Sequence, residues 1–184
     1  MSEPATRPAP GAIRDSLPAD LPAIAAIYAH YVATSLATFD EIAPSAEDMG
    51  QRRAQLVAAG LPFVVAANGA GRIEGYAYAA PFRPRSGYRF SLEDSIYVEP
   101  AASRRGIGTA LLATLIERCA ASGYRQLVAV IGDTANAGSI ALHEKLGFAH
   151  VGLMPAIGFK LGHWVDGVLM QRPLGAGATS PPQR

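Results

Sequence analysis

The chain has 184 residues, of which 49% are hydrophobic and 17% charged, and its formal net charge is +1. This length is enough for one well-buried α/β core and short for two. The composition is typical of a folded globular domain and excludes a disordered chain. Because there is no excess of basic residues, nucleic acid is not expected as the main partner.

The sequence also bears on location. The first eleven residues lack the basic start and apolar core of a secretory signal, and no uninterrupted apolar stretch approaches membrane-spanning length. The single cysteine, Cys119, excludes an internal disulfide and fits a reducing compartment. We therefore expect a cytoplasmic protein with no membrane partner.

Hydrophobic spacing and turn residues predict one domain over residues 12–173, between flexible tails at 1–11 and 174–184. No internal repeat and no linker indicates a second domain. In chain order the predicted elements are a strand at 12–14, helices from 21 and over 45–60, strands at 63–67, 72–80 and 88–98, a helix at 110–121, a strand at 127–131, a helix at 136–147, and strands at 148–158 and 164–172.

The segment 99–109, between a predicted strand and a predicted helix, contains Arg104, Arg105, Gly106 and Gly108. Small residues let backbone N–H groups turn toward an anion, and the start of a helix adds partial positive charge. The segment therefore predicts a phosphate or diphosphate site, although an ordinary strand-to-helix turn remains an alternative. A dinucleotide fingerprint would need a third glycine, and no Gly-Lys-Ser/Thr of a triphosphate loop occurs.

This segment resembles the acetyl-coenzyme A diphosphate loop of the GCN5-related N-acetyltransferases (GNATs), Gln/Arg-x-x-Gly-x-Gly/Ala. Ser103 stands where that family usually has Gln or Arg, so Arg104 or Arg105 could supply the missing charge. The resemblance implies an α+β GNAT fold with a central, mostly antiparallel twisted sheet flanked by helices. It also implies acetyl-coenzyme A as co-substrate and no metal. The implied contacts to the co-substrate are Ile96, Tyr97, Val98, Arg104, Arg105, Gly106, Ile107, Gly108, Thr109 and Asn136.

The segment from Asn136 to Phe148 resembles the second signature of that family, Asn-x-x-(Ser/Ala)-x-x-(Leu/Phe)-Tyr-Glu-Lys-x-Gly-Phe. In the family the Asn contacts the coenzyme A arm, and the Tyr often acts as general acid for the departing thiolate. His143 occupies the Tyr position, and imidazole titrates near the working pH. His143 could therefore protonate the thiolate or orient the acyl group. A capping role for Asn136 and a structural role for His143 remain open.

The C-terminal pattern Gly158-Phe159-Lys160-x-Gly162-x-Trp164-x-Asp166, together with Glu93 and His143, resembles the phosphinothricin N-acetyltransferase branch of the family. The resemblance covers roughly residues 12–172. It implies acetylation of the α-amino group of phosphinothricin, methionine sulfoximine or methionine sulfone, and it implies a homodimer.

A protonated amine cannot attack a thioester until a base near it has taken the proton. Glu93 lies just before the strand that borders the diphosphate loop, and we expect it to be that base, directly or through a water. Asp94 is the rival, and a solvated glutamate at a strand start is the structural alternative. Cys119 falls on the apolar face of a predicted helix, so we expect a packing residue and no covalent acetyl-enzyme.

Arg83 and Arg85 flank Pro84 immediately before the strand that carries Glu93. Forked guanidinium donors there could grip carboxylate or phosphinate oxygens, with ordinary solvent-exposed loop arginines as the alternative. The expected substrate contacts are Arg83, Pro84, Arg85, Glu93, Asp94 and Ser95, and Tyr31, Phe39 and Lys160 are further candidates for the pocket wall.

Two other functions remain possible from the sequence. An enzyme of the same family could acetylate a peptide N-terminus, a polyamine or an aminoglycoside, although the two loop arginines would disfavour a polycationic acceptor. A non-catalytic coenzyme A-binding module would keep the residues of the diphosphate loop but would not need Glu93 or His143.

Overall fold

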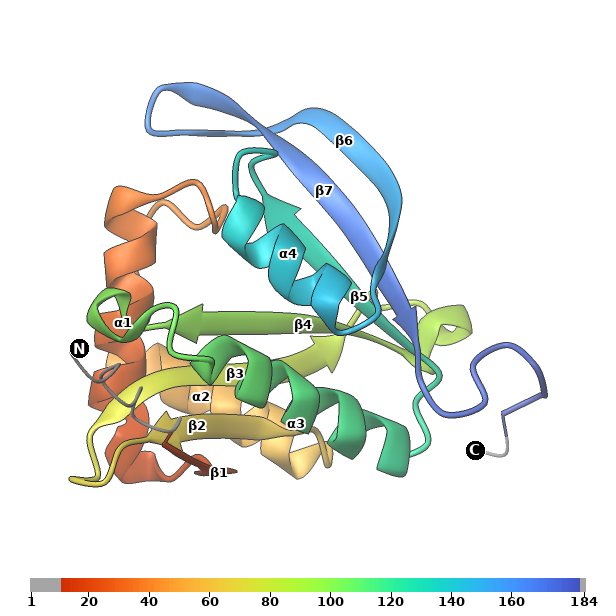
Figure 1. Cartoon of the computed structure of the whole chain (residues 1–184), viewed down its shortest axis with the longest axis horizontal. Coiled ribbons are helices and arrows are strands. Elements are labelled where there is room, and N and C mark those ends of the chain that lie inside the picture. Colours follow the sequence, from red (N-terminus) through yellow and green to blue (C-terminus); the bar gives the residue numbers. More distant parts are fainter. Residues whose placement is uncertain (1–10, 183–184) are drawn as a thin grey trace, which may run out of the picture.

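A twisted seven-stranded sheet with the order β1-β2-β3-β4-β5-β7-β6 forms the centre of the computed structural model, which describes residues 11–182 (Figure 1). All neighbouring strands in it are antiparallel except β4 and β5. This confirms the predicted fold class. The strands are β1 (Ala12–Asp15), β2 (Phe63–Ala67), β3 (Ile73–Pro81), β4 (Ser91–Val98), β5 (Gln126–Gly132), β6 (Ala149–Lys160) and β7 (His163–Pro173), and the helices are α1 (Leu21–Thr34), α2 (Ala46–Ala58), α3 (Ile107–Ala121) and α4 (Ala137–Lys145).

The predicted boundaries agree closely with these elements, with three differences. Helix α3 begins at Ile107 rather than at residue 110, because Gly106 takes a left-handed conformation (φ 85°) directly before it. Residues 88–90 precede β4 rather than belonging to it. Leu174, predicted to lie in a flexible tail, is 1% exposed and packs in the main core. The tail predicted at the N-terminus lies outside the described residues apart from its last residue.

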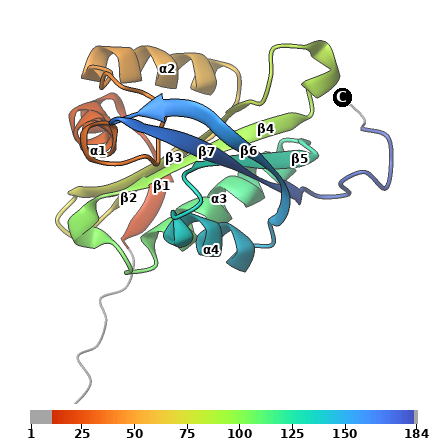
Figure 2. The same cartoon turned by 90° about the horizontal axis from the view of Figure 1, so that it is seen from above.

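The helices cover both faces of the sheet, α1 and α2 on one and α3 and α4 on the other (Figure 2). On β3, the side chains of Tyr76 and Tyr78 pack in the larger core with α1 and α2, whereas Ala77 packs with α3. A Cβ on Gly75 would lie 3.1 Å from the Tyr97 carbonyl oxygen and 3.2 Å from the nearest side-chain atom of α3. The small residues of β3 therefore allow α3 to approach the sheet closely.

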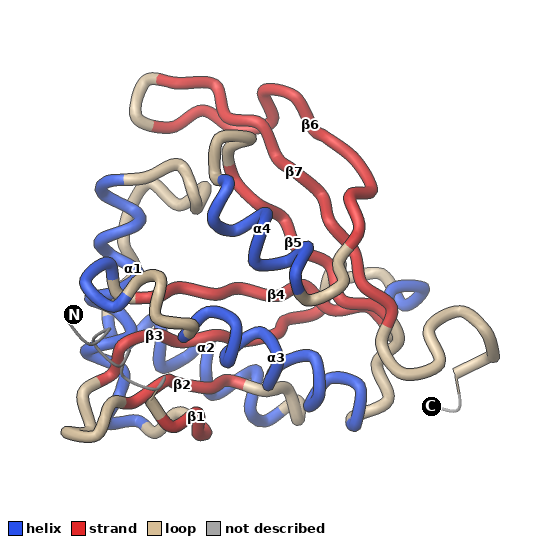
Figure 3. Tube along the Cα trace, in the orientation of Figure 1, coloured by secondary structure: helices blue, strands red, loops and turns tan. Residues whose placement is uncertain are grey.

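Strands β4 and β5 pair over only three residues each before they separate. The pairing joins Ser91 to Gln126 and ends at Glu93 with Val128, although β4 continues to Val98 and β5 to Gly132. Figure 3 shows the two strands diverging beyond this point. The middle of the sheet therefore contains a wedge-shaped opening that no other strand fills.

Two further features of the described part of the chain bear on function. Cys119 is fully buried in α3, which confirms its predicted packing role. None of the described helices combines the length and the apolar character needed to cross a membrane.

Candidate active site

A cavity of about 730 Å³ lies where β4 and β5 separate, and residues from both faces of the sheet line it. Its walls along the sheet are residues 93–98 of β4 and 129–131 of β5. The side of α3 and α4 contributes the segment that precedes α3 and the first turns of both helices. The opposite side contributes Tyr28, Tyr31, Arg52 and the loop after α1. One cavity thus joins the two faces of the sheet through the wedge.

The segment before α3 has the geometry of an anion site. Arg104 (φ 60°) and Gly106 (φ 85°) are both left-handed, and this turns the chain sharply into α3. The N–H groups in the first turn of a helix have no intrahelical acceptors, and they carry the positive end of the helix dipole. A Cβ on Gly108 would lie 3.2 Å from the Leu142 side chain, so the start of α3 lies close against α4. These features fit the diphosphate of acetyl-coenzyme A at the mouth of the cavity.

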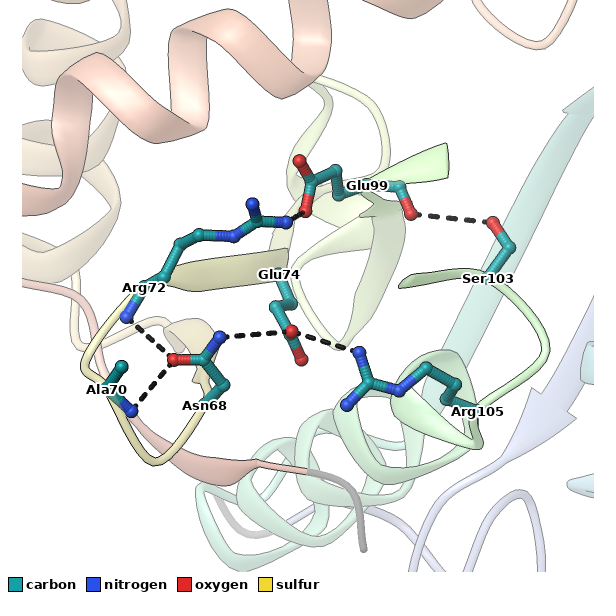
Figure 4. Close-up of polar contacts among 7 residues, drawn as sticks. All are labelled: Asn68, Ala70, Arg72, Glu74, Glu99, Ser103 and Arg105. Atoms are coloured by element: carbon teal, nitrogen blue, oxygen red, sulfur yellow. Dashed lines mark hydrogen bonds and ion pairs between the residues drawn. The ribbon is translucent and has the colours of Figure 1, made fainter. Parts of the chain in front are cut away.

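The two arginines of this segment have different surroundings. Arg104 lines the cavity with Ser103, Gly106 and residues 107–109, whereas Arg105 is not among the residues that line it. The Arg105 guanidinium faces β3 instead, with Nη1 3.0 Å from the Glu74 carboxylate (Figure 4). Of the two arginines that could replace the family's Gln or Arg at position 103, only Arg104 lines the cavity.

Asn136 has the capping role considered for it, and it also lies in the cavity wall. Its side-chain oxygen accepts a hydrogen bond from the Ser139 N–H at 3.3 Å and caps α4. The same residue lines the cavity at the end of β5. The capping contact fixes the side chain beside the opening, and a ligand contact remains compatible with it.

Glu93 lies at the last position where β4 pairs with β5, and its side chain is 32% exposed. It lines the cavity on the same side of the strand as Tyr97, which packs against Tyr28 of α1. Burial raises the pKa of Glu93, Arg83 at 3.9 Å lowers it by less, and Asp94 raises it further. A carboxylate with a raised pKa in a cavity is a better proton acceptor than one in water.

Asp94 and His143 form a buried pair on the other side of β4. The Nε2 atom of His143 lies 3.1 Å from Oδ2 of Asp94, and its Nδ1 atom lies 2.7 Å from the Ser139 carbonyl oxygen. The two side chains are 3% and 4% exposed and line the cavity. Because both ring nitrogens face an acceptor, the doubly protonated imidazolium is favoured.

The pKa of His143 reflects a balance. Burial alone lowers the pKa, but the hydrogen bond and charge of Asp94 and the Ser139 carbonyl raise it by more, so the net pKa lies above the usual histidine value. Sequence reasoning named both residues without joining them. They are 49 positions apart, and only the packing of α4 beside β4 brings them together.

The predicted substrate contacts divide into two groups. Glu93, Asp94 and Ser95 line the cavity, whereas Arg83, Pro84 and Arg85 do not. Arg83 lies at the rim, where its guanidinium stacks 4.5 Å from the Phe82 ring centroid and its side chain is half exposed.

On the α1 and α2 side of the sheet, Arg52 of α2 lines the cavity, and the sequence analysis missed it. Its Nη1 atom donates to the Tyr78 hydroxyl at 3.1 Å. A single arginine in a polar helix gives no sequence signal that distinguishes it from a solvated one.

The loop between α1 and α2 closes the cavity on the α1 and α2 side of the sheet. Phe39 lines the cavity there, and its ring lies so near Gly158 that a Cβ at that position would be 2.4 Å from it. Lys160, one of the candidate wall residues, is 2% exposed and donates to the Thr38 carbonyl at 2.9 Å. Lys160 therefore supports the loop from behind, whereas Tyr31 and Phe39 form the wall.

We predict that Asp94→Asn lowers the pKa of His143 below the usual value of about 6.5, because burial then acts without the carboxylate charge. In the unaltered protein the pKa of His143 should lie above about 6.5. The contribution of the pair to stability should therefore be full below about pH 6.5 and should decline as pH rises through the raised pKa of the folded state. Side-chain NMR titration measures the pKa of His143 in the variant and in the unaltered protein, and His143→Gln assigns the signal. Glu144→Gln, which alters only an exposed partner of His150, is the control. Equal pKa values in Asp94→Asn and the unaltered protein would contradict the pairing.

Comparison with known proteins agrees with this geometry. Residues 24–148 match the Acetyltransferase (GNAT) family. A phosphinothricin N-acetyltransferase from Alcaligenes faecalis is 51% identical over 164 residues, which cover 89% of this chain and 83% of that protein. An L-methionine sulfoximine/L-methionine sulfone acetyltransferase from Pseudomonas aeruginosa is 40% identical over 172 residues, covering 92% of this chain and 98% of that protein.

Among solved structures, a GNAT superfamily phosphinothricin acetyltransferase from Sinorhizobium meliloti, in complex with acetyl-coenzyme A, superposes with a TM-score of 0.91. It is 48% identical, and the match covers 94% of this chain and 93% of that one. The chain belongs to the GNAT family of acetyltransferases.

Proposed function

We propose that this protein transfers the acetyl group of acetyl-coenzyme A to the α-amino group of a small amino-acid analogue of the phosphinothricin, methionine sulfoximine or methionine sulfone type. The observation that carries the proposal is the continuous cavity between the anion-binding start of α3 and the carboxylate of Glu93. The activities named for the relatives at 51% and 40% identity support this acceptor class.

Acetyl-coenzyme A would supply an activated acetyl group as a thioester, with its diphosphate against residues 103–109 and its arm beside Asn136. Beyond Glu93, β4 has no partner on the β5 side. Backbone N–H groups of Ile96 to Val98 that do not bond to β3 therefore face the opening, where they can hold the co-substrate and stabilise negative charge on the thioester oxygen. The hydroxyl of Tyr31 donates a hydrogen bond to the Val98 carbonyl oxygen and so fixes this end of β4.

Glu93 and Asp94 are successive residues of β4, so their side chains lie on opposite sides of the strand. Glu93 and the His143 that pairs with Asp94 are therefore separated by the strand. Glu93 takes a proton from the ammonium, directly or through a water, and the freed nitrogen attacks the thioester carbon. As the C–N bond forms and the C–S bond breaks, the imidazolium of His143 gives its proton to the departing sulfur, and the acetylated nitrogen releases its second proton to water. Burial raises the pKa of Cys119 to about 12, so this thiol does not compete as a nucleophile.

Arg52 offers the positive charge that an amino-acid carboxylate needs on the acceptor side of the cavity. Arg83 and Arg85 remain candidates for contacts at the rim, where Arg83 already faces Glu93. A polyamine or an aminoglycoside would bring additional positive charges toward Arg52, so these acceptors are disfavoured.

The acceptor class is tested by steady-state turnover with phosphinothricin, L-methionine sulfone and L-methionine sulfoximine against a peptide panel, spermidine and kanamycin. We expect the amino-acid analogues to give the highest kcat/KM, because their carboxylate can bind a guanidinium while the amine faces Glu93. Turnover of the peptides alone would overturn the substrate assignment but would leave the acetyltransferase reaction intact.

Glu93→Gln should lower kcat/KM by about 10²- to 10⁴-fold, the usual contribution of a general base, and leave the Kd for coenzyme A unchanged. The unaltered enzyme should lose activity as pH falls through the raised pKa of Glu93, above the ordinary value of about 4.3, and the variant should lack this limb. The titration of the substrate amine is distinguished by using two acceptors with different amine pKa values, because the fall in activity at low pH stays in place only if it comes from the enzyme. Glu144→Gln, an exposed carboxylate outside the cavity, is the control. Unchanged turnover in Glu93→Gln would remove this residue from the mechanism.

We further propose that the protein acts in the cytoplasm as a homodimer joined through β6. This edge strand and the turn after it expose Leu153, Ile157, Phe159 and Leu161, each more than half exposed, and Trp164 is 70% exposed beside Phe159. Exposed apolar side chains on an open sheet edge are typical of an interface, and a two-fold axis would bury two copies of the same patch.

Light scattering should therefore give twice the chain mass for the unaltered protein and a monomer for Leu153→Asp/Phe159→Asp. Val57→Asp, at an exposed apolar position of α2, should leave the dimer intact. A monomeric unaltered protein would refute this part of the proposal.

A further inference from the structure

Glu74 occupies an irregular position at the start of β3. In the pairing with β2, Ala66 lies opposite Gly75 but Ala67 lies opposite Ile73, so Glu74 is an extra residue in a β-bulge. The burial pattern shows the effect, since Ile73 packs in the core of Tyr76 and Tyr78 rather than on the α3 side. A bulge redirects a side chain that strict alternation would place elsewhere.

The carboxylate that the bulge redirects is buried and paired with the diphosphate loop. Glu74 is 4% exposed, and its Oε1 atom accepts from Arg105 Nη1 at 3.0 Å and from Asn68 Nδ2 at 3.1 Å. Burial raises the pKa of Glu74, but these two hydrogen bonds and the charges of Arg105 and Arg72 outweigh it, so the net pKa is lowered. Glu74 is therefore ionised, and it holds the side chains of Arg105 and Asn68 in place.

Asn68 extends this anchor to the turn between β2 and β3. Its side-chain oxygen accepts from the N–H groups of Ala70 and Arg72, both at 3.0 Å, while its nitrogen bonds to Glu74. Figure 4 shows the resulting chain of contacts from this turn through Glu74 to Arg105. These contacts thus join the hairpin of β2 and β3 to the loop in front of α3.

Arg105 lies between the two left-handed residues that shape the loop, Arg104 and Gly106. A left-handed conformation is unfavourable for a residue with a side chain, so Arg104 needs support from its surroundings. The Glu74–Arg105 pair supplies a fixed point directly after it. The same pair also keeps the Arg105 charge on the β3 side of the loop.

We propose that Glu74 is a positioning residue for co-substrate binding: by holding Arg105 against β3, it preforms the 103–109 loop so that its N–H groups and Arg104 meet the diphosphate. This inference rests on the proposed function, because it takes coenzyme A as the ligand of the loop. Arg105 acts through Glu74 and does not itself bind phosphate.

The test is calorimetric titration of the full chain with coenzyme A, using Glu74→Gln, Arg105→Ala and the double variant. If Arg105 acts only through Glu74, each single variant should weaken binding by about tenfold, the value of a lost charge-assisted hydrogen bond, and the double variant should be no weaker than either. The KM for acetyl-coenzyme A should rise in parallel, while kcat and the acceptor KM stay within about twofold. Arg118→Ala is the control, because it removes a partly exposed ion pair with Asp15 at the other end of α3, away from the loop.

The opposite model, in which Arg105 binds phosphate directly, gives a different result. Glu74→Gln would then release Arg105 toward the diphosphate and leave the affinity for coenzyme A unchanged or tighter, which would overturn the inference. Additive losses in the double variant would overturn it as well. If the unaltered protein does not bind coenzyme A, the proposed function fails and not this inference alone.

Variants of a buried ion pair can fail to fold, so a milder change completes the test. Arg105→Lys keeps a cation near Glu74 and should retain more affinity for coenzyme A than Arg105→Ala. Amide NMR shifts of Gly106 and Gly108 in the ligand-free protein should move in Arg105→Ala and less in Arg105→Lys. Unmoved amides in Arg105→Ala would show that the pair does not shape the loop.

Discussion

The early end of pairing between β4 and β5 is the constraint on which the rest of the structure depends. A sheet normally satisfies its backbone groups across every strand, and an unfilled opening in its middle exposes polar backbone to whatever enters. Here the pairing stops at Glu93 and Val128, and the opening becomes a cavity of about 730 Å³. The backbone that the sheet leaves unpaired is thus available to a ligand.

Placement of the chemical groups follows from this opening. A strand presents alternate side chains to its two faces, so a cavity that passes through the sheet can use neighbouring residues for different tasks. Glu93 faces the side of α1 and α2, where an acceptor amine would enter, and Asp94 faces α4 with its partner His143. Burial raises the pKa of Glu93, and the charge of Asp94 and its hydrogen bond raise that of His143, which suits the acceptor and donor roles proposed for them.

Buried charges support the loops around the cavity. Glu74 bonds to Arg105 of the segment before α3, and Lys160 bonds to the loop after α1 through the Thr38 carbonyl. A buried charge costs stability unless it is paired or hydrogen bonded, and replacing such groups by apolar ones often stabilises a protein. Their contribution here is therefore geometric, since each fixes a loop at a point where the cavity needs a defined wall.

The sequence by itself determined the order of the elements, the fold class and the position of the glycine-containing turn before α3, because these depend on local spacing and on short motifs such as Arg105-Gly106-Ile107-Gly108. The tertiary structure decided which side chains share the site. It placed Arg52 in the cavity, Arg105 outside it and Leu174 in the core. It also joined Asp94 to His143 across 49 positions of sequence. Local patterns report the face of a helix or strand, but contacts between distant elements depend on how those faces pack and on irregularities such as the bulge at Glu74.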